Sequence, residues 1–289
     1  MTDLSKLALE YAPPADDLKE LISSFYLFRV NNEPGEAGAQ LERADRAQFR
    51  FLLEGGGSWE FCDGKTMGAA PITIIGPTTG PSTGRFEGPI EIFGAGLQPA
   101  GWGSLMGIEG DSHTDRLIDA TAIFGSGILA VHAALKAAET MDAKVAIGNE
   151  FTRKLLDRAD PAPFWFTRLV DRWLSSASSP DIDELIAESG LSKRQVERMT
   201  KRFYGSPPKL LARKYRALRA ASALIRHEAG TEDLLEDGFY DQSHLIRELK
   251  QFTGITPGQM HDVPPELNQE IAAGRKKLTG MVSKLISDT

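Results

Sequence analysis

The sequence contains few of the side chains that form covalent cross-links or bind metals. Cys62 is the only cysteine, which excludes an internal disulfide and leaves no cysteine cluster for zinc. Because Phe61 precedes it, we expect Cys62 to be a small buried apolar side chain. His113 and His132 are the only histidines in the first 160 residues, and neither belongs to the His-x-His cluster that a metal-binding β-barrel requires. The sequence therefore predicts no metal site and no cofactor.

Long apolar segments and catalytic motifs are also lacking. No run of about 18 apolar residues and no signal peptide is present, which predicts a cytoplasmic protein that does not associate with membranes. Gly80-Pro-Ser-Thr-Gly84 matches Gly-x-Ser-x-Gly, but that nucleophile motif needs a helix directly after the serine. The residues that follow, Arg85 to Pro89, cannot begin a helix at once. We therefore predict a turn here and no enzyme.

The C-terminal part of the chain contains an internal repeat at an offset of 49 residues. A glycine and an apolar residue precede each copy, as Gly190-Leu191 and as Gly238-Phe239. Two copies at a fixed spacing predict two contacts with one partner. The aligned residues are Ser192, Val196, Arg198, Lys201, Phe203, Gly205 and Pro208 in the first copy, and Asp241, Leu245, Arg247, Lys250, Phe252, Gly254 and Pro257 in the second.

Each copy has the pattern of two short helices joined by a turn. In the first copy, apolar residues at helical spacing follow Asp181, an N-cap residue, and Gly190 stands where a left-handed C-cap is needed. Ser192 then caps a second helix, as Asp241 does in the second copy. This pattern indicates two helix-turn-helix units. Pro208 is suited to the first turn of the helix that connects them. The inward-facing side chains of the two second helices are Val196, Met199 and Phe203, and Leu245, Leu249 and Phe252.

The segment from about Pro163 to His261 resembles the DNA-binding domain of the AraC/XylS transcription regulators. The matching words are Leu-Ser-Lys-Arg-Gln-Val-Glu-Arg, Phe-Tyr-Asp-Gln-Ser-His-Leu-Ile-Arg-Glu and Phe-Thr-Gly-Ile-Thr-Pro, which begin at residues 191, 239 and 252. The resemblance implies a bacterial regulator in which two helix-turn-helix units are joined by a long helix. It also implies that the second helix of each unit enters one of two successive major grooves of double-stranded DNA.

The DNA-binding residues follow from this resemblance and from side-chain chemistry. Arg and Gln near a helix N-terminus can pair bidentately with guanine and adenine edges, whereas Lys201 and Arg213 are expected to meet phosphates. The predicted set is Lys193, Arg194, Gln195, Glu197, Arg198, Lys201, Arg202, Arg213, Gln242, Ser243, His244 and Arg247.

Three features depart from the family pattern. Ile186 and Leu234 stand where alanine is usual, and Thr200 stands where phenylalanine is usual. Asp233 replaces an apolar residue in the helix before Gly238, which also carries Glu232, Glu236 and Asp237. These departures predict either a distorted second unit or an acidic edge that weakens its hold on phosphate.

The charge distribution agrees with DNA binding although the whole chain has a net charge of −7. Residues 1–160 carry 14 Lys and Arg against 23 Asp and Glu, a net −9, and residues 161–289 carry 19 against 17, a net +2. The window 192–219 carries ten Lys and Arg against Glu197 alone, a local net of +9. A basic stretch on two adjoining helices is the electrostatic pattern of a duplex-binding surface.

The first half of the chain is predicted to be rich in β-strands. Short apolar or alternating runs between Gly and Pro turns extend from about residue 18 to 110 and indicate a small barrel or sandwich. Residues 116–158 then have a helical pattern. The family resemblance implies a cupin-like barrel that senses a small-molecule effector, followed by helices that pair subunits. Trp59, Trp102, Phe51 and Phe93 either line a ligand pocket or belong to the core.

We therefore predict an α+β protein with a sensor and dimerisation domain (1–160), an AraC-type DNA-binding domain (161–262) and a helical tail (263–289). The tail either docks on its own domain or contacts a second copy in a homodimer. The leading interpretation is a sequence-specific transcription regulator that responds to an unidentified signal and has DNA, an effector and RNA polymerase as partners.

Two alternatives remain open from the sequence. One is a small-molecule-binding or enzymatic barrel whose helical domain no longer binds DNA, which the net acidity, Thr200 and Asp233 favour. The other is a protein-interaction module, in which the tail and the helices of residues 124–158 recruit a partner.

Overall fold

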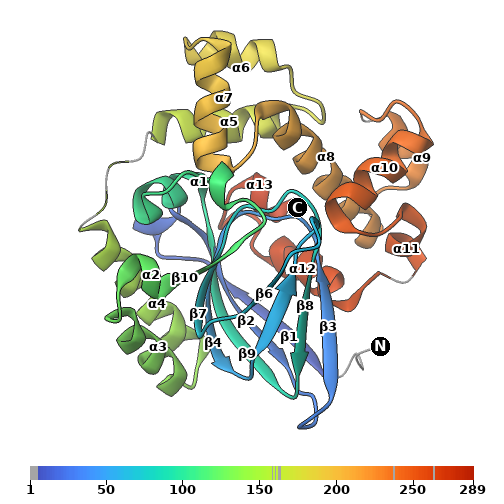
Figure 1. Cartoon of the computed structure of the whole chain (residues 1–289). Helices are drawn as coiled ribbons and strands as arrows, with labels where there is room; N and C mark the ends of the chain where they lie inside the picture. Colours follow the sequence, from blue (N-terminus) through green and yellow to red (C-terminus); the bar gives the residue numbers. More distant parts are fainter. Residues whose placement is uncertain (1–5, 158, 160, 162–163, 237, 263) are drawn as a thin grey trace.

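The computed structural model describes residues 6–157, 159, 161, 164–236, 238–262 and 264–289 (Figure 1). The sequence assignments that fall on Arg158, Pro163 and Asp237 lie outside these described residues. None of the described helices is long and apolar enough to cross a membrane. A β-rich N-terminal domain and a helical C-terminal domain are present, which confirms the predicted α+β class.

The N-terminal domain contains two antiparallel sheets. A six-stranded sheet has the order β1-β2-β9-β4-β7-β10, and a four-stranded sheet has the order β3-β8-β5-β6. The two sheets are not closed into a barrel in the part of the chain that the structure describes. The strands are β1 (Leu7–Ala12), β2 (Ile22–Val30), β3 (Ala37–Glu42), β4 (Gln48–Glu54), β5 (Gly57–Glu60), β6 (Thr66–Gly68), β7 (Ile72–Ile75), β8 (Ser82–Glu87), β9 (Ile90–Leu97) and β10 (Leu117–Asp119).

The period-2 alternation of strand side chains places the core on both faces of the larger sheet. Phe25 on β2 belongs to a core cluster with Phe49 and Leu135, between the sheet and the helices that follow it. Its neighbour Tyr26 points the other way and packs with Ile92 between the two sheets. Both faces of the six-stranded sheet are therefore covered, one by helices and the other by the four-stranded sheet.

Short helices follow the strands, and three of them cover the outer face of the larger sheet (Figure 1). They contain Ile128 and Leu135, which are 3% and 0% exposed. The predicted helical region begins later than expected, because Leu117–Asp119 pairs with β7 as β10. The helices are α1 (Pro99–Gly101), a π-helical turn (Trp102–Met106), α2 (Ala120–Phe124), α3 (Ile128–Ala137) and α4 (Met141–Leu156), with 3-10 turns at Asp16–Leu18 and Asp111–His113.

Two sequence predictions in this domain are wrong. Cys62 is exposed rather than buried, because β5 ends at Glu60 and the chain turns outward between β5 and β6. The turn predicted over Gly80 to Gly84 ends at Pro81, since β8 begins at Ser82 and pairs with β3. Three of the four aromatic candidates, Phe51, Phe93 and Trp102, belong to the core, and Trp59 lies between the sheets.

Where the structure describes it, the C-terminal domain contains helices and no strands. Its long central helix is α8, which begins at Pro208 as predicted and carries Tyr215 and Leu218 into the core. The helices are α5 (Phe164–Ser176), α6 (Ile182–Ser189), α7 (Lys193–Tyr204), α8 (Pro208–Ile225), α9 (Thr231–Glu236), α10 (Gln242–Thr253) and α11 (Pro257–Asp262).

The tail forms two helices, α12 (Glu266–Lys277) and α13 (Lys284–Ser287). α12 packs through Leu267 and Ile271 against Leu7 and Val30 of the N-terminal domain. α12 also contacts the C-terminal domain, because Arg226 at the end of α8 donates to the Ala272 carbonyl oxygen. Leu285 of α13 reaches the core of the first helix-turn-helix unit, so the tail contacts both domains.

Candidate nucleic-acid interface

The first unit consists of α6, a turn and α7, and local capping fixes its shape. The Asp181 carboxylate accepts from the Asp183 amide at 2.9 Å, and Gly190 ends α6 with a φ of +65°. At the start of α7 the Ser192 amide donates to Oε1 of Gln195 at 2.9 Å, while the Gln195 amide donates to the Ser192 hydroxyl. This capping box satisfies two of the amides that a helix start leaves free. Gln195 therefore has a structural partner in its own helix.

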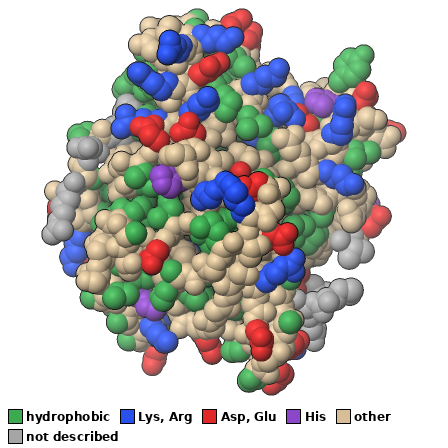
Figure 2. Space-filling model, viewed as in Figure 1, with side chains coloured by type: hydrophobic (Ala, Val, Ile, Leu, Met, Phe, Trp, Pro, Cys, Tyr) green, Lys and Arg blue, Asp and Glu red, His purple; other side chains and the backbone are tan. Residues whose placement is uncertain are grey.

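The remaining cations of α7 point to solvent. Lys193, Arg194, Arg198 and Lys201 are exposed, and among the described residues no ion pair or side-chain hydrogen bond is found for them. Glu197 is half-buried. Thr200 is fully buried and donates to the carbonyl oxygen of Glu197, so a small hydroxyl fits where the family pattern has phenylalanine. Figure 2 shows Lys and Arg side chains gathered over the upper part of the molecule, where Figure 1 places α6, α7 and α8.

The second unit consists of α9, a turn and α10, and its acidic first helix is formed. The Asp233 carboxylate accepts from the Gly230 amide at 2.8 Å, and Leu234 is 7% exposed in the core. The Asp241 carboxylate caps α10 by accepting from the His244 amide at 2.7 Å. Asp233 therefore lies on the solvent side of α9 and orders the start of that helix.

Within α10, the buried carboxylate of Glu248 gathers three basic side chains. It is 1% exposed and accepts from Nε of Arg213 at 2.7 Å and Nη2 of Arg216 at 2.8 Å. Nε2 of His244 lies 3.2 Å from it, and Nδ1 of His244 accepts from the Tyr240 amide at 3.3 Å. Two predicted DNA-binding residues, His244 and Arg213, thus have intramolecular partners. Gln242, Ser243 and Arg247 remain exposed on α10.

Four of the ten cations in the basic window are not exposed, namely Arg213, Lys214, Arg216 and Arg219. Lys214 is 3% exposed and donates to the carbonyl oxygens of Asp45 and Thr78 in the N-terminal domain, and its burial lowers its pKa to about 8. Arg219 donates to the carbonyl oxygen of Leu174. Arg202 is exposed but lies 3.4 Å from Glu109 of the N-terminal domain. The local charge of +9 therefore overstates what the surface presents.

Tyr240 is a feature of the second unit that the sequence interpretation missed. The repeat offset is 48 residues from Gly190-Leu191 to Gly238-Phe239 but 49 residues from Ser192 to Asp241. Tyr240 is the inserted residue, and its side chain is 92% exposed beside the start of α10. The change of offset inside the repeat was the signal that could have identified it.

The N-terminal domain holds both second helices at their C-terminal ends. The Gly110 amide donates to the carbonyl oxygen of Arg202 at 2.8 Å, near the end of α7. The Ala44 amide donates to the carbonyl oxygen of Phe252 at 2.7 Å, near the end of α10. The opposite, N-terminal halves of α7 and α10 keep their exposed side chains.

The loop between β7 and β8 lies against the C-terminal ends of both α7 and α10. Gly205 and Gly254, which end α7 and α10, have φ angles of +73° and +80°. A Cβ atom on Gly205 would lie 3.0 Å from Pro77, and one on Gly254 would lie 3.3 Å from Pro81. Both prolines belong to the β7–β8 loop (residues 76–81), which includes the start of the Gly-x-Ser-x-Gly match. This loop acts as a spacer between the two units.

Comparison with known proteins agrees with this arrangement. Residues 185–262 match a family model described as a helix-turn-helix domain. Among curated proteins, none matches the sequence significantly. ToxT from Vibrio cholerae, solved at 1.65 Å, is 8% identical with a TM-score of 0.47, over 81% of this chain and 96% of that chain. ToxT with a bound unsaturated fatty acid is 9% identical with a TM-score of 0.46, over 81% and 94%.

The β-rich domain has a separate likeness. An RmlC-like cupin protein from Desulfovibrio desulfuricans is 14% identical with a TM-score of 0.25, over 34% of this chain and 88% of that chain. At such low identities and TM-scores, these structural likenesses carry no argument about function.

The class of protein follows from the matched segment and its geometry. The C-terminal part of the chain is a helix-turn-helix domain of the AraC type, the DNA-binding domain of a family of transcription regulators. In the chain it follows a β-rich N-terminal domain.

Proposed function

We propose that this protein is a sequence-specific transcription regulator whose two helix-turn-helix units read two successive major-groove segments on one face of DNA. The observation that carries the proposal is the shared presentation of α7 and α10. Each is fixed at its C-terminal end by the N-terminal domain and exposes its N-terminal half. Helix-turn-helix proteins read base edges with the N-terminal residues of the second helix.

The proposed DNA-reading residues are those that the fold leaves exposed. Arg194, Arg198, Gln242 and Arg247 are assigned to base edges, and Lys193, Ser243 and Lys201 to base edges or phosphates. Gln195, Glu197, Arg202, Arg213 and His244 are not assigned to DNA, because each is engaged within the protein or only half exposed.

Regulation is proposed to pass through the N-terminal domain, since that domain touches the ends of both reading helices. A small-molecule signal there would change the spacing or the rigidity of α7 relative to α10. Contact with RNA polymerase and pairing of two copies are further parts of the proposal. The alternative is a protein that does not bind DNA, and the following experiment distinguishes it from the proposal.

The direct test is a titration of the full chain into labelled DNA from upstream of its own gene, at several salt concentrations. Unrelated DNA of equal length serves as the control. We expect tight, site-dependent binding with a steep decrease of affinity with salt, since released counterions drive phosphate contacts. A genome-wide selection of bound fragments then identifies an operator that does not lie upstream of the gene. If that selection also yields no preferred sequence, the proposal is wrong, and the protein is either a small-molecule-binding or enzymatic barrel or a protein-interaction module.

A further inference from the structure

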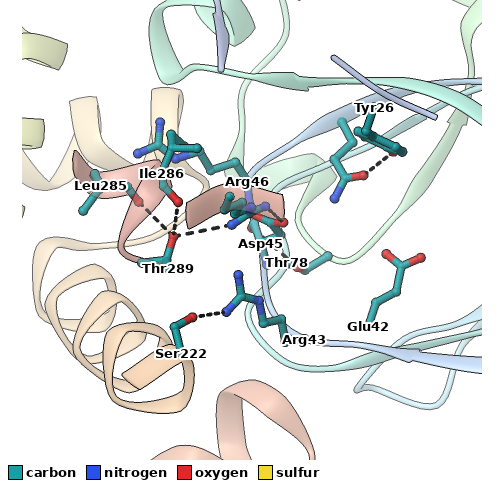
Figure 3. A network of polar contacts seen from close by, with 12 residues as sticks. Tyr26, Glu42, Arg43, Asp45, Arg46, Thr78, Ser222, Leu285, Ile286 and Thr289 are labelled. Carbon is teal, nitrogen blue, oxygen red and sulfur yellow. Dashed lines mark hydrogen bonds and ion pairs between the residues drawn. The ribbon is translucent and has the colours of Figure 1, made fainter. Parts of the chain in front are cut away.

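A buried cluster of three arginines lies where the two domains meet. Arg43 and Arg46 belong to the β3–β4 loop (residues 43–47), and Arg275 comes from α12. They are 3%, 6% and 8% exposed. Figure 3 shows Arg43 reaching Ser222 on α8. Arg275 lies between Asp45, with which it forms an ion pair, and the Thr289 hydroxyl of the tail, to which it donates. We call the three arginines the arginine cluster.

The cluster carries more positive than negative charge. Asp45 forms an ion pair with Arg275, and Asp171 attracts Arg46 at longer range. Asp115 attracts the buried ammonium of Lys214, which also faces Asp45. Against these three carboxylates stand the three guanidinium groups and that ammonium. Burial, and then repulsion by Arg275, lower the pKa of Arg43 to about 9. Buried cations in excess are costly unless an anion balances them.

Donors of the cluster are also left over. Nη1 of Arg43 donates to Ser222 at 3.0 Å, and Nε of Arg46 donates to the Tyr215 hydroxyl at 2.9 Å. Four other buried nitrogens, Nε and Nη2 of Arg43, Nη2 of Arg46 and Nε of Arg275, have no acceptor among the described residues. In folded proteins such buried donors are almost always satisfied.

These residues line one cavity. It has a volume of about 50 Å³ and is bordered on its polar side by the arginine cluster, Ser23 and Ser24, and by Leu267 among its apolar residues. The carboxylates of Glu42 and Asp45 also line it, but each is paired with an arginine, Glu42 with Arg50 and Asp45 with Arg275. That volume suits several water molecules or one compact anion. Guanidinium groups bind oxyanions with paired, charge-assisted hydrogen bonds, so the excess charge, the free donors and the space all fit the same kind of ligand.

We propose that this cavity binds a compact oxyanion, a short carboxylate or inorganic phosphate, through Arg43, Arg46 and Arg275. The same loop also contacts the DNA-binding domain. Ala44 donates to Phe252 at the end of α10, and the Asp45 carbonyl accepts from Lys214 on α8. An anion held by this loop is therefore an effector that biases the position of the second unit. This coupling rests on the proposed function, whereas binding of the anion does not.

The binding test uses the full chain without DNA. Thermal unfolding and calorimetry are measured with sodium acetate, propionate or phosphate at constant ionic strength, against chloride. We expect a saturable rise in Tm with at least one of them, and the pattern among the three separates a carboxylate from a phosphate site. Arg43→Gln should weaken binding at least tenfold. Arg85→Gln, which removes an arginine exposed on the same domain, should leave binding unchanged.

Two results would overturn the site: no saturable binding of any of the three anions to the wild type, or equal binding by Arg43→Gln. If Arg43→Gln does not fold, wild-type crystals soaked in bromoacetate and in selenate decide. An anomalous peak within hydrogen-bond distance of Arg43 and Arg275 supports the site, and its absence from both soaks refutes it.

The coupling has its own test, in which DNA affinity is compared with and without the saturating anion. A change of about fivefold or more is expected for coupled sites. An unchanged affinity with anion binding intact would refute the effector role alone. Absence of specific DNA binding in both conditions would instead refute the proposed function, so the two failures are distinguishable.

Discussion

Where the second helix-turn-helix unit has Glu248, the first unit has Met199 at the corresponding repeat position, and the two side chains hold their helices differently. Met199 packs against an apolar core, so the polar face of α7 stays free. Glu248 ties α10 to α8 through Arg213 and Arg216. α7 carries five Lys and Arg against one Glu, a net +4, whereas α10 carries two against one, a net +1.

The two helix-turn-helix units therefore have the same fold but present different chemical groups to solvent. The first unit presents exposed Lys and Arg side chains that can bind phosphates and guanine edges. The second presents Gln242, Ser243, Arg247 and Lys250 on α10, with the inserted Tyr240 beside its start, and only the Glu248 carboxylate of this helix is paired inside the protein. We therefore expect the first unit to dominate affinity and salt dependence, and the second to add discrimination among sequences.

The largest expected effect is on DNA affinity. Arg194→Ala combined with Arg198→Ala should weaken binding to the selected site by about 2–6 kcal/mol, since each base-reading contact is worth about 1–3 kcal/mol. Lys193→Ala with Lys201→Ala should lower the salt slope by about 2, because each lost phosphate contact removes about 0.9. Gln242→Ala with Arg247→Ala should change the slope by less than about 1, since both side chains are assigned to base edges. Fluorescence titration at several salt concentrations measures both.

Arg85→Ala with Lys136→Ala removes two exposed cations from the N-terminal domain and is the matched control. If it reduces affinity as much as the α7 pair, general charge rather than α7 is responsible.

The next effect concerns the stability of the second unit. Glu248→Ala leaves Arg213 and Arg216 without their carboxylate and should lower the free energy of unfolding by about 3–5 kcal/mol, as for other broken buried ion pairs. Met199→Ala should cost about 2 kcal/mol or less, because Met199 is only half-buried. Urea denaturation measures the loss, and hydrogen exchange should place it in α10. Equal losses for the two variants would remove the distinction drawn between the units.

The pH dependence of stability tests the helix that joins the units. Burial lowers the pKa of Lys214 from 10.5 to about 8. Below about pH 8 the cost of burying the ammonium is present in full, and between about pH 8 and 10.5 the unfolded chain binds more protons than the folded chain. Stability should therefore rise over that range, by up to roughly 3 kcal/mol.

Urea denaturation from about pH 7 to pH 10 checks this rise. Lys214→Met should remove the rise between about pH 8 and pH 9, above which the lowered pKa of Arg43 also contributes. Lys209→Met, on an exposed position of the same helix, should retain it. The same pH profile in all three proteins would mean that Lys214 is not the responsible group.

The smallest effect is expected at Tyr240. Its side chain is 92% exposed, so Tyr240→Ala should change the free energy of unfolding by less than about 0.5 kcal/mol. DNA affinity should fall by about 1 kcal/mol if the hydroxyl donates to a phosphate. Tyr240→Phe separates hydroxyl from ring: an equal loss points to the hydroxyl, and an affinity unchanged in both variants excludes Tyr240 from the interface.

Local features of the helical domain were predictable because they depend on residues a few positions apart. Asp181, Ser192 and Asp241 cap helices where their spacing predicted, and Gly190 takes the left-handed conformation. Apolar or alternating runs predicted strands between about residues 18 and 110, and β2, β4, β7 and β9 contain such runs. By contrast β3 and β8 were missed, because their alanines, glycines and polar residues carry no strand pattern and only their pairing with each other defines them. β1 alternates but lies before that range, and its pairing with β2 defines it.

The two capped helix-turn-helix units, and the buried stripe of each helix, could be predicted from the sequence, since capping and period 3.6 act within one helix. Which charges those helices present depends on contacts with distant parts of the chain. The sequence shows three basic residues, Arg213, Lys214 and Arg216, that the folded protein turns inward. Each donates to a carboxylate or a carbonyl oxygen that lies 32 to 169 residues away in the chain. The same holds for α12, whose apolar stripe found its partner on β1 at the opposite end of the chain.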